Sequence, residues 1–350
     1  IKLYLNSNEI ITLQMEVLMP QTNLQSIFQN FIKKTTPIFK DRNALTINFT
    51  PETIPHREKQ IETLATILAP SLKGSKPSNV FIYGTTGTGK TLVTKYVTQE
   101  LEKVSLQTLN PVKILYVNCK MKKIADTEYR LIAELCRLLG HEVPFTGLPT
   151  EQLYHLFFKL IDARKWVVII VLDEIDALVK KIGDEFLYNF TRINQELRNA
   201  KVSFIGITND LNLIEMLDPR VKSSSGEEEI LFPPYNALEL QDILRQRAKL
   251  AFFDGVLEES VIPKCAAIAA QEHGDARKAL DLLRVAGEIA ERNNENKVTS
   301  THVDLARKKI AYERIVEAVK SLPKHSKAVL WAIIKTIEEK KEDVQTGDVY

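Results

Sequence analysis

Residues 84–91 read Gly84-Thr85-Thr86-Gly87-Thr88-Gly89-Lys90-Thr91 and match the pattern G-x-x-x-x-G-K-S/T. The apolar run Val80–Tyr83 before them predicts a strand, and the residues from Lys90 to about Val104 predict a helix. In that context the loop amides and the helix N-terminus cradle phosphates, while Lys90 reaches the β- and γ-phosphates and the Thr91 hydroxyl binds Mg²⁺. We therefore predict that residues Gly84 to Leu92 bind ATP or ADP; the alternative is a chance glycine-rich turn.

Short apolar runs alternate with amphipathic stretches from Val80 onward, which is typical of the α/β class with a parallel sheet covered by helices on both faces. Five runs have the composition of strands buried on both faces. They are Val80–Tyr83, Ile114–Asn118, Trp166–Leu172, Val202–Ile207 and Glu229–Phe232. The residues Asp126–Leu139 between two of them have helical spacing.

Two adjacent acids, Asp173 and Glu174, follow the strand Trp166–Leu172. The carboxyl ends of parallel strands are where such sheets bind ligands, so both acids are expected beside the phosphate loop. We predict that Asp173 holds Mg²⁺, directly or through water, and that Glu174 polarises the water that attacks the γ-phosphate. Asn209 ends what we expect to be the neighbouring strand and would bring an amide to the same water. The alternatives are a solvated strand end and, for Asn209, a simple turn residue.

The alternation stops at Phe232-Pro233-Pro234-Tyr235, because two prolines fit neither a central strand nor a helix interior. Beyond them Asn236 and Glu239 form the pattern of a capping box that opens a helix to about Phe253. Further helices are predicted at Glu258–Glu272, Asp275–Asn293, Thr301–Val319 and, after a break at Pro323, Ser326–Lys340. The predicted organisation is an unassigned arm (1–40), a nucleotide-binding domain (41–235), a helical domain (236–318) and the start of a third domain (319–350).

Composition sets broad limits on the function. A formal net charge of +2 neither demands nor excludes a nucleic-acid partner. Three dispersed cysteines without a CxxC pair indicate reduced thiols in an intracellular setting. The longest apolar run, Trp166–Leu172, is too short to cross a bilayer, and the first thirty residues lack the pattern of a signal peptide. We expect a cytoplasmic protein with no membrane partner.

Six segments, taken together, carry a family resemblance. They are the phosphate loop, Leu172-Asp173-Glu174-Ile175-Asp176, Thr208-Asn209-Asp210, Leu217-Asp218-Pro219-Arg220-Val221-Lys222-Ser223-Ser224, Phe232-Pro233-Pro234-Tyr235 and His273-Gly274-Asp275-Ala276-Arg277-Lys278-Ala279-Leu280. In this order they resemble the archaeal replication initiators, which are AAA+ proteins related to the origin recognition complex and its licensing factor. The resemblance covers roughly residues 40 to 350.

The resemblance implies roles for several residues around the nucleotide. Asn209 would be sensor 1, and Arg277 would be sensor 2, reaching from a helical lid. Tyr235 and Arg247 would contact nucleotide at the junction of sheet and lid. The segment Pro55-His56-Arg57 resembles the one that lines the adenine pocket.

Arg220 resembles an arginine finger that acts on a neighbouring subunit. Eukaryotic relatives carry a second arginine four residues later, where this chain has Ser224. That departure puts hydrolysis stimulated by a neighbouring subunit in doubt. Without the resemblance, Arg220 and Arg277 would each be read as a solvated surface charge.

The resemblance also implies contacts with double-stranded DNA. The stretch from Asn118 to Leu139, running on to Gly147, corresponds to a helical insertion that initiators press against DNA, and the end from about Val319 resembles the start of a winged helix. The candidate DNA-binding residues are Lys120, Lys122, Lys123 and Arg130. A solvated amphipathic surface is the alternative, because the insertion as a whole is close to neutral.

The implied function is that of a replication initiator with slow ATPase activity. Its partners would be origin DNA, the replicative helicase and other initiator subunits, and its location the cytoplasm at the nucleoid. ATP would act mainly as a conformational switch between sheet domain and lid. The alternative is an AAA+ ATPase of another class, a clamp-loader-like subunit or a signalling switch that does not bind origins.

Overall fold

The computed structural model describes residues 37–46, 49–121, 126–144, 147–224 and 227–340. Five parallel strands form one sheet in the order β2-β3-β4-β1-β5, which confirms the predicted fold class. Their bounds are β1 Asn79–Tyr83, β2 Val112–Asn118, β3 Val167–Asp173, β4 Lys201–Thr208 and β5 Glu227–Leu231. Each strand overlaps a predicted one, and β4 pairs with β3 as the prediction for Asn209 required.

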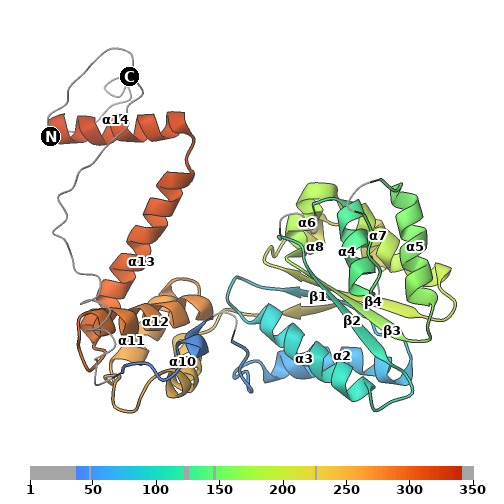
Figure 1. Ribbon diagram of the computed structural model, residues 1–350, viewed down its shortest axis with the longest axis horizontal. Coiled ribbons are helices and arrows are strands. Elements are labelled where there is room, and N and C mark those ends of the chain that lie inside the picture. The colour runs from blue at the N-terminus through green and yellow to red at the C-terminus, as the bar shows by residue number, and fades with distance from the viewer. Residues whose placement is uncertain (1–36, 47–48, 122–125, 145–146, 225–226, 341–350) are drawn as a thin grey trace. The chain divides into compact units, whose positions relative to one another are not determined.

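Helices cover both faces of the sheet (Figure 1). The first face is covered by α2 (Glu58–Leu68), followed by the 3-10 helix η2 (Ala69–Lys73), and by α3 (Lys90–Ser105). The second face is covered by α4 (Glu128–Leu138), α5 (Thr150–Asp162), α6 (Ile175–Ile182) and α7 (Glu185–Glu196), and the short α8 (Leu213–Met216) and α9 (Pro219–Ser224) follow β4. Strand β3 is buried throughout, and its side chains alternate between the two cores. A strand enclosed in this way holds its terminal acid in a fixed position.

A third core lies in the helical lid. It is built by α10 (Ala237–Ala251), α11 (Val261–Gln271), α12 (Ala276–Arg292) and the first half of α13 (Ser300–Ser321), each overlapping a predicted helix. The predicted capping box at Asn236 and Glu239 is present. Residues before the sheet also join this core: Ala44 and Leu45 of the 3-10 helix η1 (Arg42–Leu45) and, before it, Phe39, whose ring stacks on Phe252 at 4.8 Å. The sequence did not predict this packing, because the predicted boundaries leave Phe39 unassigned and place Ala44 and Leu45 in the nucleotide-binding domain.

The last described helix is α14 (Lys324–Lys340), which follows the break at Pro323. Beyond Ile310, α13 exposes most of its side chains, and α14 exposes Trp331 at 63%. The winged helix stays a prediction, since 341–350 lie outside the described residues. No helix in the described part of the chain is long and apolar enough to span a membrane.

Candidate nucleotide-binding site

The phosphate loop joins β1 to α3 and encloses the side chain of Lys90, which is 5% exposed. The Lys90 ammonium donates to the carbonyl oxygens of Gly84 at 2.8 Å and Thr85 at 2.7 Å. Burial, together with the nearby charge of Arg277, lowers the pKa of Lys90 to about 8. The loop therefore holds a cation at its centre, bonded to carbonyls that phosphate oxygens can replace.

Gly87 is the point where the lid meets this loop. Its φ is +72°, and a Cβ at this position would lie 1.7 Å from Oδ1 of Asp275, so only glycine fits. The amide of Ala276 donates to the Gly87 carbonyl at 3.2 Å, and the Thr86 hydroxyl lies 3.5 Å from Asp275 Oδ2. The N-terminus of α12 is thus bonded directly to the phosphate loop.

Asp173 ends β3 and is 4% exposed. Its Oδ2 accepts from the Thr91 hydroxyl at 3.0 Å and from the Tyr116 hydroxyl, while Oδ1 accepts from the Glu174 amide at 3.0 Å. The two predicted Mg²⁺ ligands therefore lie together, and carboxylate and hydroxyl oxygens are the donors that Mg²⁺ prefers. The residues fit the ion, whose binding here stays a prediction.

Glu174 has a left-handed backbone with φ of 56°, which is strained for a residue with a side chain. Its carboxylate pairs with Lys120 Nζ at 3.1 Å. The pairing follows from the register of β2 and β3. Asn118 lies opposite Asp173, and the segments that follow these two residues leave the sheet next to each other. A predicted catalytic acid and a predicted DNA contact thus share one ion pair.

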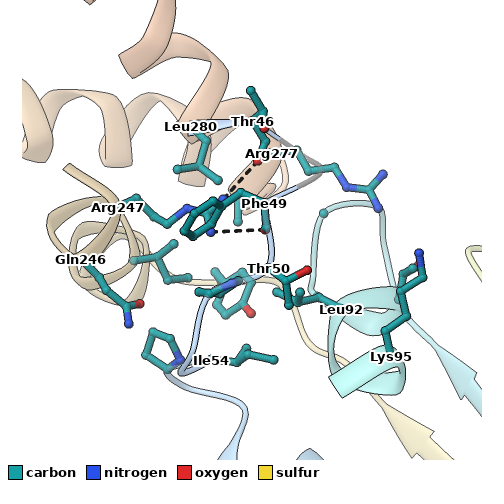
Figure 2. Close-up of a pocket in the computed structure, with 18 residues that line it drawn as sticks. Thr46, Phe49, Thr50, Ile54, Leu92, Lys95, Gln246, Arg247, Arg277 and Leu280 are labelled. Atoms are coloured by element: carbon teal, nitrogen blue, oxygen red, sulfur yellow. Dashed lines mark hydrogen bonds between the residues drawn. The ribbon is translucent and has the colours of Figure 1, made fainter. Parts of the chain in front are cut away.

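A cavity of about 290 Å³ opens beside the phosphate loop (Figure 2). Phe49, Ile54 and Leu280 are among its apolar lining residues. In Figure 2 the side chains of Arg277 and Lys95 lie on one side of the cavity and those of Arg247 and Gln246 on the other. An apolar pocket next to a phosphate loop has the form expected for a nucleotide base and sugar.

Arg247 is buried in the wall of this cavity, at 5% exposure. It donates to the carbonyls of Thr46 at 3.1 Å and Phe49 at 3.4 Å, and its guanidinium lies 4.4 Å from the centre of the Phe49 ring. Burial lowers the pKa of Arg247 to about 10. Its Nε has no hydrogen-bond partner among the described residues, and a buried donor of this kind usually has an acceptor.

Most of the predicted nucleotide-binding residues meet at the cavity. Pro55, Gly87, Gly89, Thr91, Leu92, Tyr235, Arg247 and Arg277 all line it. Arg57 does not: it is buried, donates to the carbonyls of Thr88 at 2.9 Å and Pro233 at 2.6 Å, and lies 3.7 Å from the centre of the Tyr235 ring. Its position suits it to support the loop and Tyr235 from behind.

The remaining predicted residues lie outside the cavity lining. They are Gly84, Thr85, Thr86, Thr88 and Lys90 of the phosphate loop, the acids Asp173 and Glu174, and Asn209 and Arg220. Asn209 follows Thr208, which pairs in register with Tyr83, the residue before the phosphate loop. The side chain of Arg220, on α9, is 73% exposed and is bonded to Asp218, the residue before that helix.

The four DNA candidates divide between described and undescribed residues. Arg130 pairs with Asp126 at 3.3 Å, and Lys120 pairs with Glu174. Lys122 and Lys123 lie outside the described residues.

Sequence reasoning missed three contributors to this site. Tyr116 binds Asp173 from the edge strand β2, and no sequence signal separates it from an ordinary strand tyrosine. Asp275, the N-cap of α12, could have been found from its place before Arg277. Phe49 belongs to no predicted element, and its ring lines the cavity against Arg247.

Comparisons with known proteins agree with this architecture. Family models match residues 73–214, as an AAA domain, and 241–308, as a Cdc6 AAA+ ATPase-type lid domain. The ORC1-type DNA replication protein of Pyrococcus horikoshii is 54% identical over 94% of this chain and 79% of its own length. The chain belongs to the ORC1-type DNA replication protein family.

Two further relatives agree with this assignment. The ORC1-type DNA replication protein 1 of Methanosarcina acetivorans is also 54% identical, over 94% of this chain and 78% of its own length. Among solved structures, the Aeropyrum pernix ORC1 protein in complex with DNA is 48% identical, with a TM-score of 0.78 over 89% of this chain and 80% of that one. The resemblance to initiators is thereby confirmed, and this ORC1-type chain has an AAA+ ATPase domain and a lid.

Proposed function

We propose that this ORC1-type protein is an ATP-dependent replication initiator that binds double-stranded origin DNA and helps to recruit the replicative helicase, with other initiator subunits as further partners. The observation that carries the nucleotide part is that Asp173, through Thr91, and the N-terminus of α12, through Gly87, are both bonded to a phosphate loop that borders one cavity. The DNA part is supported by the family and by the A. pernix relative, which was solved with DNA. The proposed location is the cytoplasm, at the nucleoid.

On nucleotide binding, Lys90 exchanges the carbonyls of Gly84 and Thr85 for phosphate oxygens. The base and sugar pack between Phe49, Ile54 and Leu280. Thr91 and Asp173 would hold Mg²⁺, which would supply charge neutralisation at the phosphates. The Tyr116 hydroxyl holds one oxygen of Asp173, so this acid is fixed before ligand arrives.

Hydrolysis requires Glu174 to leave Lys120 and turn to the attacking water, with Asn209 orienting that water. A base held in an ion pair is unavailable for most of the time, which favours the slow turnover that we propose. Arg220 is proposed to act on a neighbouring subunit, as the family resemblance implies, because its side chain is 73% exposed.

The switch function rests on Arg277 and the contact between Ala276 and Gly87. Arg277 lines the cavity from the lid and depresses the pKa of Lys90, so it lies close enough to sense the charge of the γ-phosphate. A ligand shifts a conformational equilibrium only by binding one state better than the other. ATP satisfies this condition where ADP does not, because only ATP presents the γ-phosphate to Arg277.

The test is footprinting of the protein on candidate origins of its own chromosome, with ATP, with ADP and without nucleotide. We expect protection of origin sequences that depends on nucleotide and is absent from random duplex. Lys103→Ala, an exposed substitution on α3, serves as the control for Lys90→Ala, which should lose the nucleotide dependence. A protein that binds ATP but protects no origin would favour the rival role as a clamp-loader-like subunit or signalling switch.

A further inference from the structure

A second cavity, of about 210 Å³, lies in the lid between α11, α12 and α13. We call it the lid cavity. Its apolar lining consists of Ile268, Ala269, Leu282, Ile310 and Ala311, and its polar lining of Glu272, Lys278, Arg307 and Arg314. None of these residues lines the nucleotide cavity or takes part in the chemistry proposed above.

The polar lining is unevenly charged, with three cations and one carboxylate. Lys278 Nζ lies 3.3 Å and Arg314 Nη1 lies 3.9 Å from the same oxygen, Oε2 of Glu272. Arg307 takes part in no ion pair within the described part of the chain, and its side chain is exposed on α13. The lining therefore carries a net charge of +2 around its apolar residues, which we call the floor of the lid cavity.

We propose that the lid cavity docks an acidic segment of a partner protein, with one large apolar side chain on its floor and flanking carboxylates on the cations. A volume of about 210 Å³ accommodates one aromatic or branched aliphatic side chain. The guanidinium groups of Arg307 and Arg314 have the planar donor geometry that binds carboxylates in pairs.

Charge complementarity with an apolar anchor favours an acidic peptide over nucleic acid. A DNA backbone would engage the cations but leave the floor of Ile268, Leu282 and Ile310 without an apolar partner. An acidic peptide uses both features at once, because anchor residues in pockets carry most of the binding energy and surrounding charges select the partner.

The first experiment measures fluorescence anisotropy of a short labelled peptide, one phenylalanine flanked by glutamates, with the full chain. Two analogues replace the phenylalanine by alanine or the glutamates by glutamines. We expect each analogue to bind about tenfold more weakly than the parent. Absence of binding by the parent peptide, or binding of either analogue as tight as that of the parent, overturns the proposal.

The second experiment uses substitutions matched within α13. Arg307→Glu should weaken the parent peptide about tenfold, whereas Lys308→Glu, the adjacent exposed residue outside the cavity, should leave its affinity unchanged. Ala311→Leu fills the cavity and should also weaken binding, with Ala318→Leu as its control outside the cavity. ATP affinity reports that each variant is folded.

Two outcomes of the second experiment overturn the proposal. One is an equal loss of affinity in Arg307→Glu and Lys308→Glu, which would mean that the peptide senses only the charge of α13. The other is a loss of duplex DNA affinity in Arg307→Glu with no change in peptide binding, which would assign the cations to nucleic acid.

Discussion

The two ends of the nucleotide cavity are built differently. At the phosphate end three charged groups already have partners: Lys90 is bonded to loop carbonyls, Asp173 to Thr91 and Tyr116, and Glu174 to Lys120. At the base end the walls are apolar, and Arg247 has an Nε donor without a partner among the described residues. A bound nucleotide must therefore replace existing bonds within the protein at the phosphate end, whereas it only adds contacts at the base end.

This difference predicts how each end responds to substitution. Removing a charge from the phosphate end takes away a group that no neighbour replaces, so large effects are expected. Removing an apolar side chain from the base end costs only its own contacts, so moderate effects are expected, equal for ATP and ADP.

The largest effect is expected for Glu174→Gln. The amide keeps the size of the side chain and removes the base, so hydrolysis should fall by about 100-fold to 10,000-fold while ATP affinity changes little. Steady-state phosphate release and equilibrium titration with labelled ATP measure the two quantities. Turnover at the normal rate would exclude Glu174 as the base, and Glu185→Gln at the start of α7 is the matched control.

Lys90→Ala should weaken ATP binding by about 100-fold, because it removes the cation that we propose contacts both terminal phosphates. The same titration measures the change. Lys103→Ala, near the other end of α3, removes an equal charge from an exposed position and should bind ATP normally. Equal affinities for the two variants would contradict the assignment of the phosphate loop.

Phe49→Ala tests the base end. Its ring lines the cavity and lies against Arg247, so its loss should weaken ATP and ADP by the same factor, about tenfold. Phe253→Ala, at a half-exposed position after α10, is the control. A loss confined to ATP would mean that Phe49 acts on the γ-phosphate and that the two ends are not separate.

The same two ends differ in what the sequence could predict. The phosphate end comes from contiguous motifs, since loop, strand and acid pair are each fixed by local patterns at Gly84–Thr91 and Asp173-Glu174. At the base end, Phe49 packs against the lid core and Ile54 against the sheet core, and neither belongs to a predicted element. The residues predicted there, Pro55, Tyr235 and Arg247, came only from the family resemblance. The pair of Glu174 with Lys120 depends on the β2–β3 register, which no local pattern sets.

Arg277→Ala should affect the coupling between bound nucleotide and lid arrangement more than it affects the affinity for ATP or ADP. ATP would still bind, but the preference of the lid for ATP over ADP should fall by about fivefold. X-ray scattering with ATP and with ADP measures the change of arrangement, and Arg292→Ala at the far end of α12 is the control. A variant that responds to ATP as the parent protein does would exclude Arg277 as the sensor.

The smallest effect is expected outside the cavity, from replacing Lys120, Lys122 and Lys123 together by alanine. Phosphate contacts are independent of base sequence, so the affinities for origin and for random duplex should fall by similar factors. The slope of log K against the logarithm of the salt concentration should become shallower by about one to three units. Anisotropy in a salt series on both duplexes measures this.

Because Lys120 also holds Glu174, the single variant Lys120→Ala separates the two roles of this lysine. It should lower the salt slope by about one unit at most, and it should raise the ATPase rate by freeing the base. An unaltered slope in the triple variant would mean that these lysines are solvated and do not contact DNA. An unaltered ATPase rate in Lys120→Ala would show that the ion pair does not restrain Glu174.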